Sequence, residues 1–114
     1  MMEPAKIMSK EFINPEDTKL ATLAQSTLKR SGANQAAALR DTTGRTYVAI
    51  NISSPSLTLD ALDAVFTVAM ASQISGIEGV VVTGVKPEKI GAIVENSPLA
   101  TVFYIDHDGE ILAL

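Results

Sequence analysis

The chain contains no cysteine and no tryptophan, and it has one histidine, two tyrosines and three phenylalanines. Without cysteine it forms neither a disulfide nor a thiolate metal site. Its 9 Lys and Arg residues are outnumbered by 13 Asp and Glu residues, which gives a net charge of -4. Binding to a nucleic-acid backbone needs a basic surface, so this charge balance argues against nucleic acid as a partner.

Long apolar runs are also missing. The most apolar stretch, residues 57–70, is interrupted by Asp60 and Asp63, so it does not have the composition of a membrane span. Residues 1–12 have no continuous apolar segment of the kind that a secretory signal needs. We therefore predict a cytoplasmic protein with no membrane partner.

What is present is enough for one aliphatic core, since hydrophobic residues make up 46% of the 114 residues. We predict a flexible N-terminal tail over residues 1–13 and one domain over residues 14–114. A first helix is expected to begin at Asn14 and Pro15, which suit the cap and the first helical position. Gly32 is expected to close this helix in the left-handed conformation.

The pattern downstream predicts an α/β fold with a mixed sheet of about five strands and helices on its faces. Ser56 or Thr58 is available as the cap of the second helix, and Ile90, Ile93 and Val94 are expected to face inward from the third. The expected elements are strands at 35–40 and 45–52, a helix at 57–73, a strand at 79–83, a helix at 87–95, a strand at 100–105, a turn at 106–109 and a short strand or tail at 110–114.

One stretch of the sequence, residues 32–83, contains a series of short motifs in a recognisable order. They are the run Ala36, Ala37, Ala38 and Leu39, the turn residue Gly44, the strand residue Tyr47, and Asn51. This stretch resembles the cytidine deaminase family, whose order is G-A-A-L, a turn glycine, a strand tyrosine, N-x-E and then C-A-E at the start of a helix. The resemblance implies a single-domain cytidine deaminase-like sandwich.

The same comparison implies that the zinc site of the family is missing. Leu62 and Ala64 stand where C-A-E has its zinc ligand and its proton-shuttling glutamate, and Val85 and Glu88 stand at the cysteine spacing of the later P-C-x-x-C. In the family, zinc activates water and the glutamate moves the protons. We therefore expect no bound zinc, no other cofactor and no catalytic residue at these positions.

Of the two residues with which the family binds the sugar, the sequence keeps one. Asn51 matches the Asn that holds a ribose hydroxyl, whereas Ser53 replaces the Glu. Together with Asp60 and Asp63, these residues are the candidates for ligand binding. Asp60, Asp63 and Glu88 could also form a carboxylate site for a hard cation, although acidic residues in a first helical turn are ordinary partners of the helix dipole.

The single histidine, His107, lies in Asp106-His107-Asp108-Gly109. It could act as a general base between two carboxylates, but Asp-Gly more strongly indicates a hairpin turn.

Three functions follow as hypotheses. The first is a pseudoenzyme that binds a nucleoside without catalysis. The second is a homo-oligomeric scaffold, a dimer or tetramer, that a charge introduced at Ala69 or Met70 would dissociate. The third is a hydrolase rebuilt on Asp60, Asp63, Glu88 or His107.

Overall fold

In the computed structural model, which describes residues 8–114, the first helix has the ends that the sequence predicts. Helix α1 (Pro15–Ser31) begins after Asn14, whose side chain accepts a hydrogen bond of 2.9 Å from the Glu16 N–H. It ends at Gly32, which has a φ of 70° and donates its N–H to the Leu28 carbonyl. Both signals are local, and both predictions are confirmed.

The strands form the mixed sheet that the sequence predicts. β6 (Ile77–Gly84) and β7 (Thr101–Ile105) are parallel, whereas the other neighbouring pairs of the main sheet are antiparallel. A separate small hairpin pairs β4 (Ile52–Ser53) with β5 (Thr58–Leu59). The main sheet has the order β1 (Met8–Ser9), β8 (Ile111–Ala113), β7 (Thr101–Ile105), β6 (Ile77–Gly84), β2 (Gln35–Asp41) and β3 (Thr46–Ile50).

The sheet includes part of the segment, residues 1–13, that was predicted to be a flexible tail. Met8 and Ser9 pair with β8, and the Phe12 ring packs edge-on against Phe103 at a centroid distance of 5.3 Å. The packed part of the chain therefore begins before residue 14. Residues 1–7 of the expected tail lie outside the described residues.

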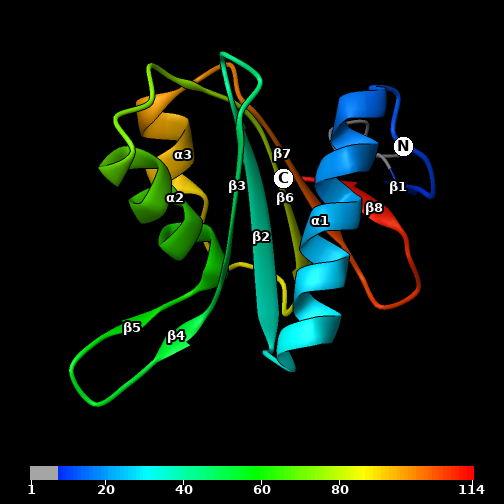
Figure 1. Ribbon diagram of the computed structural model, residues 1–114. Helices are drawn as coiled ribbons and strands as arrows, with labels where there is room; N and C mark the ends of the chain where they lie inside the picture. Colours follow the sequence, from blue (N-terminus) through cyan, green and yellow to red (C-terminus); the bar gives the residue numbers. More distant parts are fainter. Residues whose placement is uncertain (1–7) are drawn as a thin grey trace, which may run out of the picture.

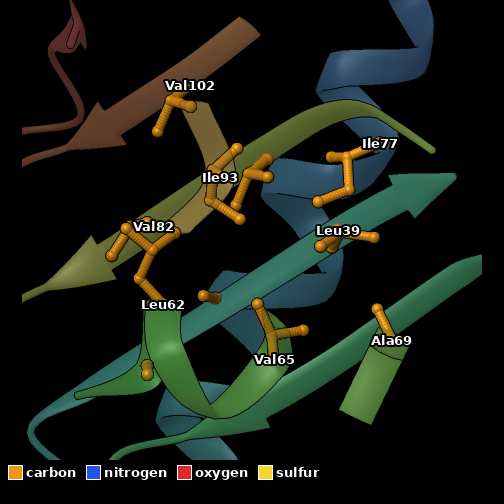
Figure 2. Packing of buried hydrophobic residues seen from close by; sticks show 11 residues of the cluster. Leu39, Leu62, Val65, Ala69, Ile77, Val82, Ile93 and Val102 are labelled. Carbon is orange, nitrogen blue, oxygen red and sulfur yellow. The ribbon is translucent and has the colours of Figure 1, made fainter. Parts of the chain in front are cut away.

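Helices cover both faces of the sheet (Figure 1). α1 covers one face, and α2 (Ala61–Ala71) and α3 (Gly91–Asn96) cover the other. Strand β2 lies between these layers and is buried along its whole length. Ala38 packs in the α1 core, whereas Ala37 and Leu39 belong to the core under α2 and α3. Figure 2 shows this second core, where Leu62 and Val65 of α2 lie beside Leu39 and Val82.

The alanines of β2 form a strand despite their low strand propensity. Ala36, Ala37 and Ala38 are all completely buried, and helices pack on both faces of their strand. Small side chains allow helices to approach both faces, so packing decides the conformation rather than propensity.

The second helix begins later than the sequence predicts. Its cap is Asp60, whose Oδ1 accepts a 2.7 Å hydrogen bond from the Asp63 N–H, so the caps expected at Ser56 and Thr58 are wrong. Residues 52–59 form the β4–β5 hairpin instead. The Ser54 hydroxyl donates to the Leu57 carbonyl within its turn and stabilises the hairpin.

The third helix is also shorter than predicted. β6 continues to Gly84, and residues 85–90 turn across the end of the sheet before α3 begins at Gly91. Ile93 is completely buried and Ile90 packs against the same core, as expected. Val94 is 43% exposed, so its predicted inward position is wrong.

Among the described residues, no helix combines the length and the apolar character that crossing a membrane requires.

Candidate functional site

A cleft of about 400 Å³ opens at the end of the sheet where β2 begins and β6 ends. Four short segments line it: residues 34–35, 51–53, 58–60 and 85–89. This volume lies in the range of small-molecule binding sites. The cleft also lies beside the first residues of α2, so it brings together segments that are far apart in the sequence.

Residues 85–89, which line the cleft, follow directly after Gly84, the last residue of β6. Gly84 has a φ of 94°, and a Cβ atom there would lie 2.2 Å from the Asn34 carbonyl oxygen, so only glycine fits. The Val85 N–H donates to the same Asn34 carbonyl at 3.0 Å. The Tyr104 hydroxyl donates to the Gly84 carbonyl at 2.5 Å. Burial, and then the nearby Asp106 carboxylate, raises the pKa of Tyr104, which keeps the hydroxyl protonated as a donor.

Asn51 lines the cleft, and the oxygen of its side-chain amide is already hydrogen-bonded within the protein. Its Oδ1 accepts a 3.1 Å hydrogen bond from the Gln35 N–H, and its own N–H donates to the Gln35 carbonyl at 3.2 Å. Within residues 8–114, no acceptor takes the Nδ2 protons of Asn51. Asn51 therefore has an amide donor left for a bound molecule, and Ser53 lies beside it on the exposed rim.

The acidic candidates do not gather into one group. Asp60 lines the cleft, but its Oδ1 caps α2, and Asp63 is not among the lining residues. Glu88 lines the cleft together with Lys86 and Lys89. In the described part of the chain, no three His, Cys, Asp or Glu side chains lie close enough together to hold a metal ion.

Comparison with known proteins identifies the family and the fold of this chain. A family model described as cytidine deaminase-like matches residues 13–109. The chain belongs to the cytidine deaminase-like family. Its structure is similar to a crystal structure of cytidine deaminase from Burkholderia pseudomallei, with a TM-score of 0.68 over 85% of this chain and 90% of that one. The two sequences are 15% identical, so this likeness establishes the fold alone. No curated protein sequence matches the chain.

The four positions that were predicted to stand in place of the family's motifs lie in different surroundings. Leu62 and Ala64 are buried at 0% and 2% exposure, and neither lines the cleft. Val85 is 59% exposed and Glu88 is exposed, and both do line it. Of these four side chains, Glu88 alone carries an atom that could ligate a metal.

His107 lies outside the cleft of this family member. It is part of the hairpin turn between β7 and β8, where the Gly109 N–H donates to the Asp106 carbonyl at 3.0 Å. Its side chain is 89% exposed, and its Nε2 lies 3.5 Å from Asp108 Oδ1. The turn that Asp-Gly indicates is therefore confirmed.

Gln35 was not among the site residues predicted from the sequence, yet it is 3% exposed at the start of β2 and lines the cleft. Its side-chain amide spans the cleft's base, from the start of α2 to the residue after β6. The signal in the sequence is a polar residue directly before the run Ala-Ala-Ala-Leu of a buried strand. A polar side chain at such a position needs hydrogen-bond partners, but the sequence does not say which.

Proposed function

We propose that this member of the family is a pseudoenzyme: a non-catalytic protein that binds a nucleoside-like ligand in the cleft without zinc. The observation that carries the proposal is the Asn51 amide, which faces the cleft with its oxygen committed to Gln35 and its donor group available. The Asn is kept while the hydrolytic residues are absent, and this combination favours binding over catalysis.

The residues at the family's zinc positions do not fit the metal. Zinc in proteins is held by thiolate, imidazole or carboxylate ligands. The chain has no cysteine, and Leu62 and Val85 are hydrocarbon side chains, so Glu88 is the one ligating group that remains. Ala64 has no acid or base function in place of the glutamate. We therefore derive no hydrolytic step through zinc.

The lining of the cleft suggests the chemistry of its ligand. Ile52, Leu59, Val85 and Pro87 offer hydrocarbon surface, which suits a flat ring. The Asn51 amide offers a donor, which suits a sugar hydroxyl oxygen, and the Ser53 hydroxyl can donate or accept. Because Ser53 replaces a carboxylate, we expect a neutral hydrogen bond to the sugar, which is weaker than a charge-assisted one.

The test is thermal unfolding in the presence of a nucleoside panel that begins with cytidine and deoxycytidine. A ligand of the folded state at a hundred times its dissociation constant adds about 2.7 kcal/mol, a midpoint rise on the order of 10 °C in a domain of this size. We expect such a rise with at least one pyrimidine nucleoside.

The matched variant is Asn51→Ala, which removes the amide donor and offers a sugar hydroxyl no acceptor in its place. It should abolish the midpoint rise, measured against the variant's own unliganded midpoint, whereas Asn96→Ala, at an exposed position on α3, should leave it intact. No rise with any nucleoside, or an unchanged rise in Asn51→Ala, would overturn the proposal.

A second candidate function, the homo-oligomeric scaffold, draws support from the outer face of α2. No charged residue occurs between Asp63 and Glu78, and Thr67, Val68 and Ala71 are exposed on this helix. An uncharged helix face that includes a valine 42% exposed suits contact with a second copy. A hydrolase rebuilt on carboxylates has less support, because Asp60, Asp63 and Glu88 form no metal-holding group.

A further inference from the structure

Gln35 makes four hydrogen bonds to three separate segments around the cleft. Its Oε1 accepts from the Ala61 N–H at 2.6 Å, and its Nε2 donates to the Val85 carbonyl at 2.6 Å. Its backbone N–H and carbonyl pair with Asn51. These partners lie at the start of α2, after the end of β6 and at the junction between β3 and β4.

The chemistry of an amide suits both side-chain contacts. The Ala61 N–H is in the first turn of α2, where backbone donors have no partner within the helix and carry partial positive charge. The Val85 carbonyl is an acceptor and needs a donor. A neutral amide offers one acceptor and two donors on the same rigid group, so Gln35 satisfies both without placing a charge in a buried site.

The anchor points of Gln35 adjoin the positions of the lost motifs. Ala61 directly precedes Leu62, and Val85 is itself a motif position, so the amide connects the two segments that hold these positions. Each functional atom of the side chain makes one of these contacts. Gln35 therefore positions the segments that line the cleft.

We propose that the Gln35 bridge, defined as the two side-chain hydrogen bonds to Ala61 and Val85, is a metal-free strut that holds the cleft open. By fixing residue 35 at the base of the cleft, the strut also places the backbone N–H and carbonyl that hold Asn51. The part of this inference that concerns Asn51 and its ligand rests on the proposed function. The strut itself does not, because it is a property of the unliganded protein.

The test is the variant Gln35→Glu, whose carboxyl group has nearly the shape of the amide. As a carboxylate it still accepts from Ala61, but it has no proton for Val85 and places a charge in a buried site. As a protonated acid it can make both bonds.

Burial and the Val85 carbonyl disfavour the charged form, and so do the carboxylates Asp60 and Glu88 that line the same cleft. The first turn of α2 and the side chains of Lys86 and Lys89 favour it. Because residue 35 is 3% exposed, we expect burial to dominate, so the pKa of the introduced carboxyl in the folded protein should lie above its unfolded value of about 4.3.

The sign of the pH dependence follows from that difference. A group that binds its proton more tightly in the folded state makes folding more favourable as pH falls towards its unfolded pKa. We expect the unfolding midpoint of Gln35→Glu to lie well below that of the unmodified chain at about pH 8, and most of this deficit to disappear by about pH 5. The matched control is Gln25→Glu on the exposed face of α1, which should show no such recovery.

A second measurement covers the case in which Gln35→Glu does not fold at neutral pH. Gln35→Met keeps the length of the side chain and removes both bonds. Hydrogen exchange of the Ala61 amide, followed by NMR, should be slow in the unmodified chain and much faster in Gln35→Met, while amides in the middle of β6 keep their protection.

Two outcomes would overturn the strut: a Gln35→Glu deficit that does not change with pH, or an Ala61 amide that exchanges equally fast with and without Gln35. Failure of the strut can be told apart from failure of the proposed function. If no nucleoside binds but the pH recovery is seen, the strut stands and nucleoside binding falls. If a nucleoside binds and the recovery is absent, the strut alone falls.

Discussion

Asp41 shows how a single side chain fixes a turn of this protein. It is 3% exposed at the end of β2, and its Oδ1 accepts from the Thr43 N–H at 2.8 Å, the Thr43 hydroxyl at 2.6 Å and the Arg45 N–H at 3.0 Å. The Tyr47 hydroxyl donates to Oδ2 at 3.2 Å. Burial by itself would raise the pKa of Asp41, but these four donors outweigh it and hold the pKa below its usual range.

A lowered pKa of Asp41 links this turn to acid stability. The stabilisation is fully present above the unfolded pKa of about 3.9 and is lost as pH falls through the lower folded value. We expect Asp41→Asn to lower the free energy of unfolding near neutral pH and to flatten its decline below about pH 4. Urea unfolding across this range measures both effects. Asp108→Asn in the exposed β7–β8 turn is the control. If the free energy of unfolding declines equally below about pH 4 in both variants, Asp41 is not the source of the acid sensitivity.

At the scale of elements, one buried arginine joins a helix to two strands. Arg40 of β2 is 3% exposed, and its Nη1 lies 3.0 Å from Asp17 Oδ1 in the first turn of α1. Its Nε donates to Glu78 of β6. Burial opposes the charge of Arg40, but the two carboxylates outweigh this effect and raise its pKa. From the sequence, Asp17 lies in the expected first turn of a helix, where the helix dipole favours an acidic residue. Its Arg40 partner comes from the tertiary structure.

Removing Arg40 should destabilise the folded protein, because the Asp17 carboxylate would stay buried without its ion-pair partner. We expect Arg40→Ala to lower the free energy of unfolding by about 3–5 kcal/mol, as other broken buried pairs do. The double variant Asp17→Leu with Arg40→Ala should recover a large part of the loss, since neither charge remains. Urea denaturation of the unmodified chain, the two single variants and the double variant measures the coupling free energy between Asp17 and Arg40. If the effects of the two single substitutions simply add in the double variant, the two residues are not coupled and the prediction is wrong.

Element boundaries were predicted least well where a loop competes with a helix. Apolar residues from Leu57 onward favour a long helix, but residues 52–59 pair with one another and α2 begins after Asp60. The cap at Asp60 is a local signal that the sequence contains. The hairpin that delays the helix is harder to predict, because its strands have two residues each.

At the scale of the whole molecule, the layers leave the outer face of α2 uncovered in a single chain (Figure 1). Ala69, which the sequence suggests as a probe of assembly, is completely buried inside the chain, and Met70 is partly buried. A charge at either position would therefore test folding instead. Val68, which is 42% exposed, is the position that reports on contact with another copy.

Val68→Glu tests the homo-oligomer. We expect the unmodified chain to show the mass of a dimer or tetramer by light scattering, and Val68→Glu to shift towards the monomer because a buried unpaired charge destabilises an interface. Ser26→Glu on the exposed face of α1 is the control and should leave the mass unchanged. A monomeric unmodified chain at its highest soluble concentration would reject the assembly.

The sequence by itself determined the parts of this protein that depend on neighbouring residues. Asn14, Pro15 and Gly32 set the ends of α1, Asp106 and Gly109 set a turn, and the motif order around Asn51 identified the family and its fold. Caps, turns and apolar runs involve residues a few positions apart, so the linear sequence contains the information that specifies them.

Only the tertiary structure decided how the cleft is built. Gln35 meets Ala61 and Val85 across 26 and 50 positions of the chain, and Arg40 meets Asp17 across 23. It is also the tertiary packing that buries Leu62 and Ala64 and leaves Val85 exposed at the cleft. These contacts form because helices pack on both faces of one sheet and because β2 and β6 are neighbours within it. No local pattern specifies which distant backbone group a buried amide will reach.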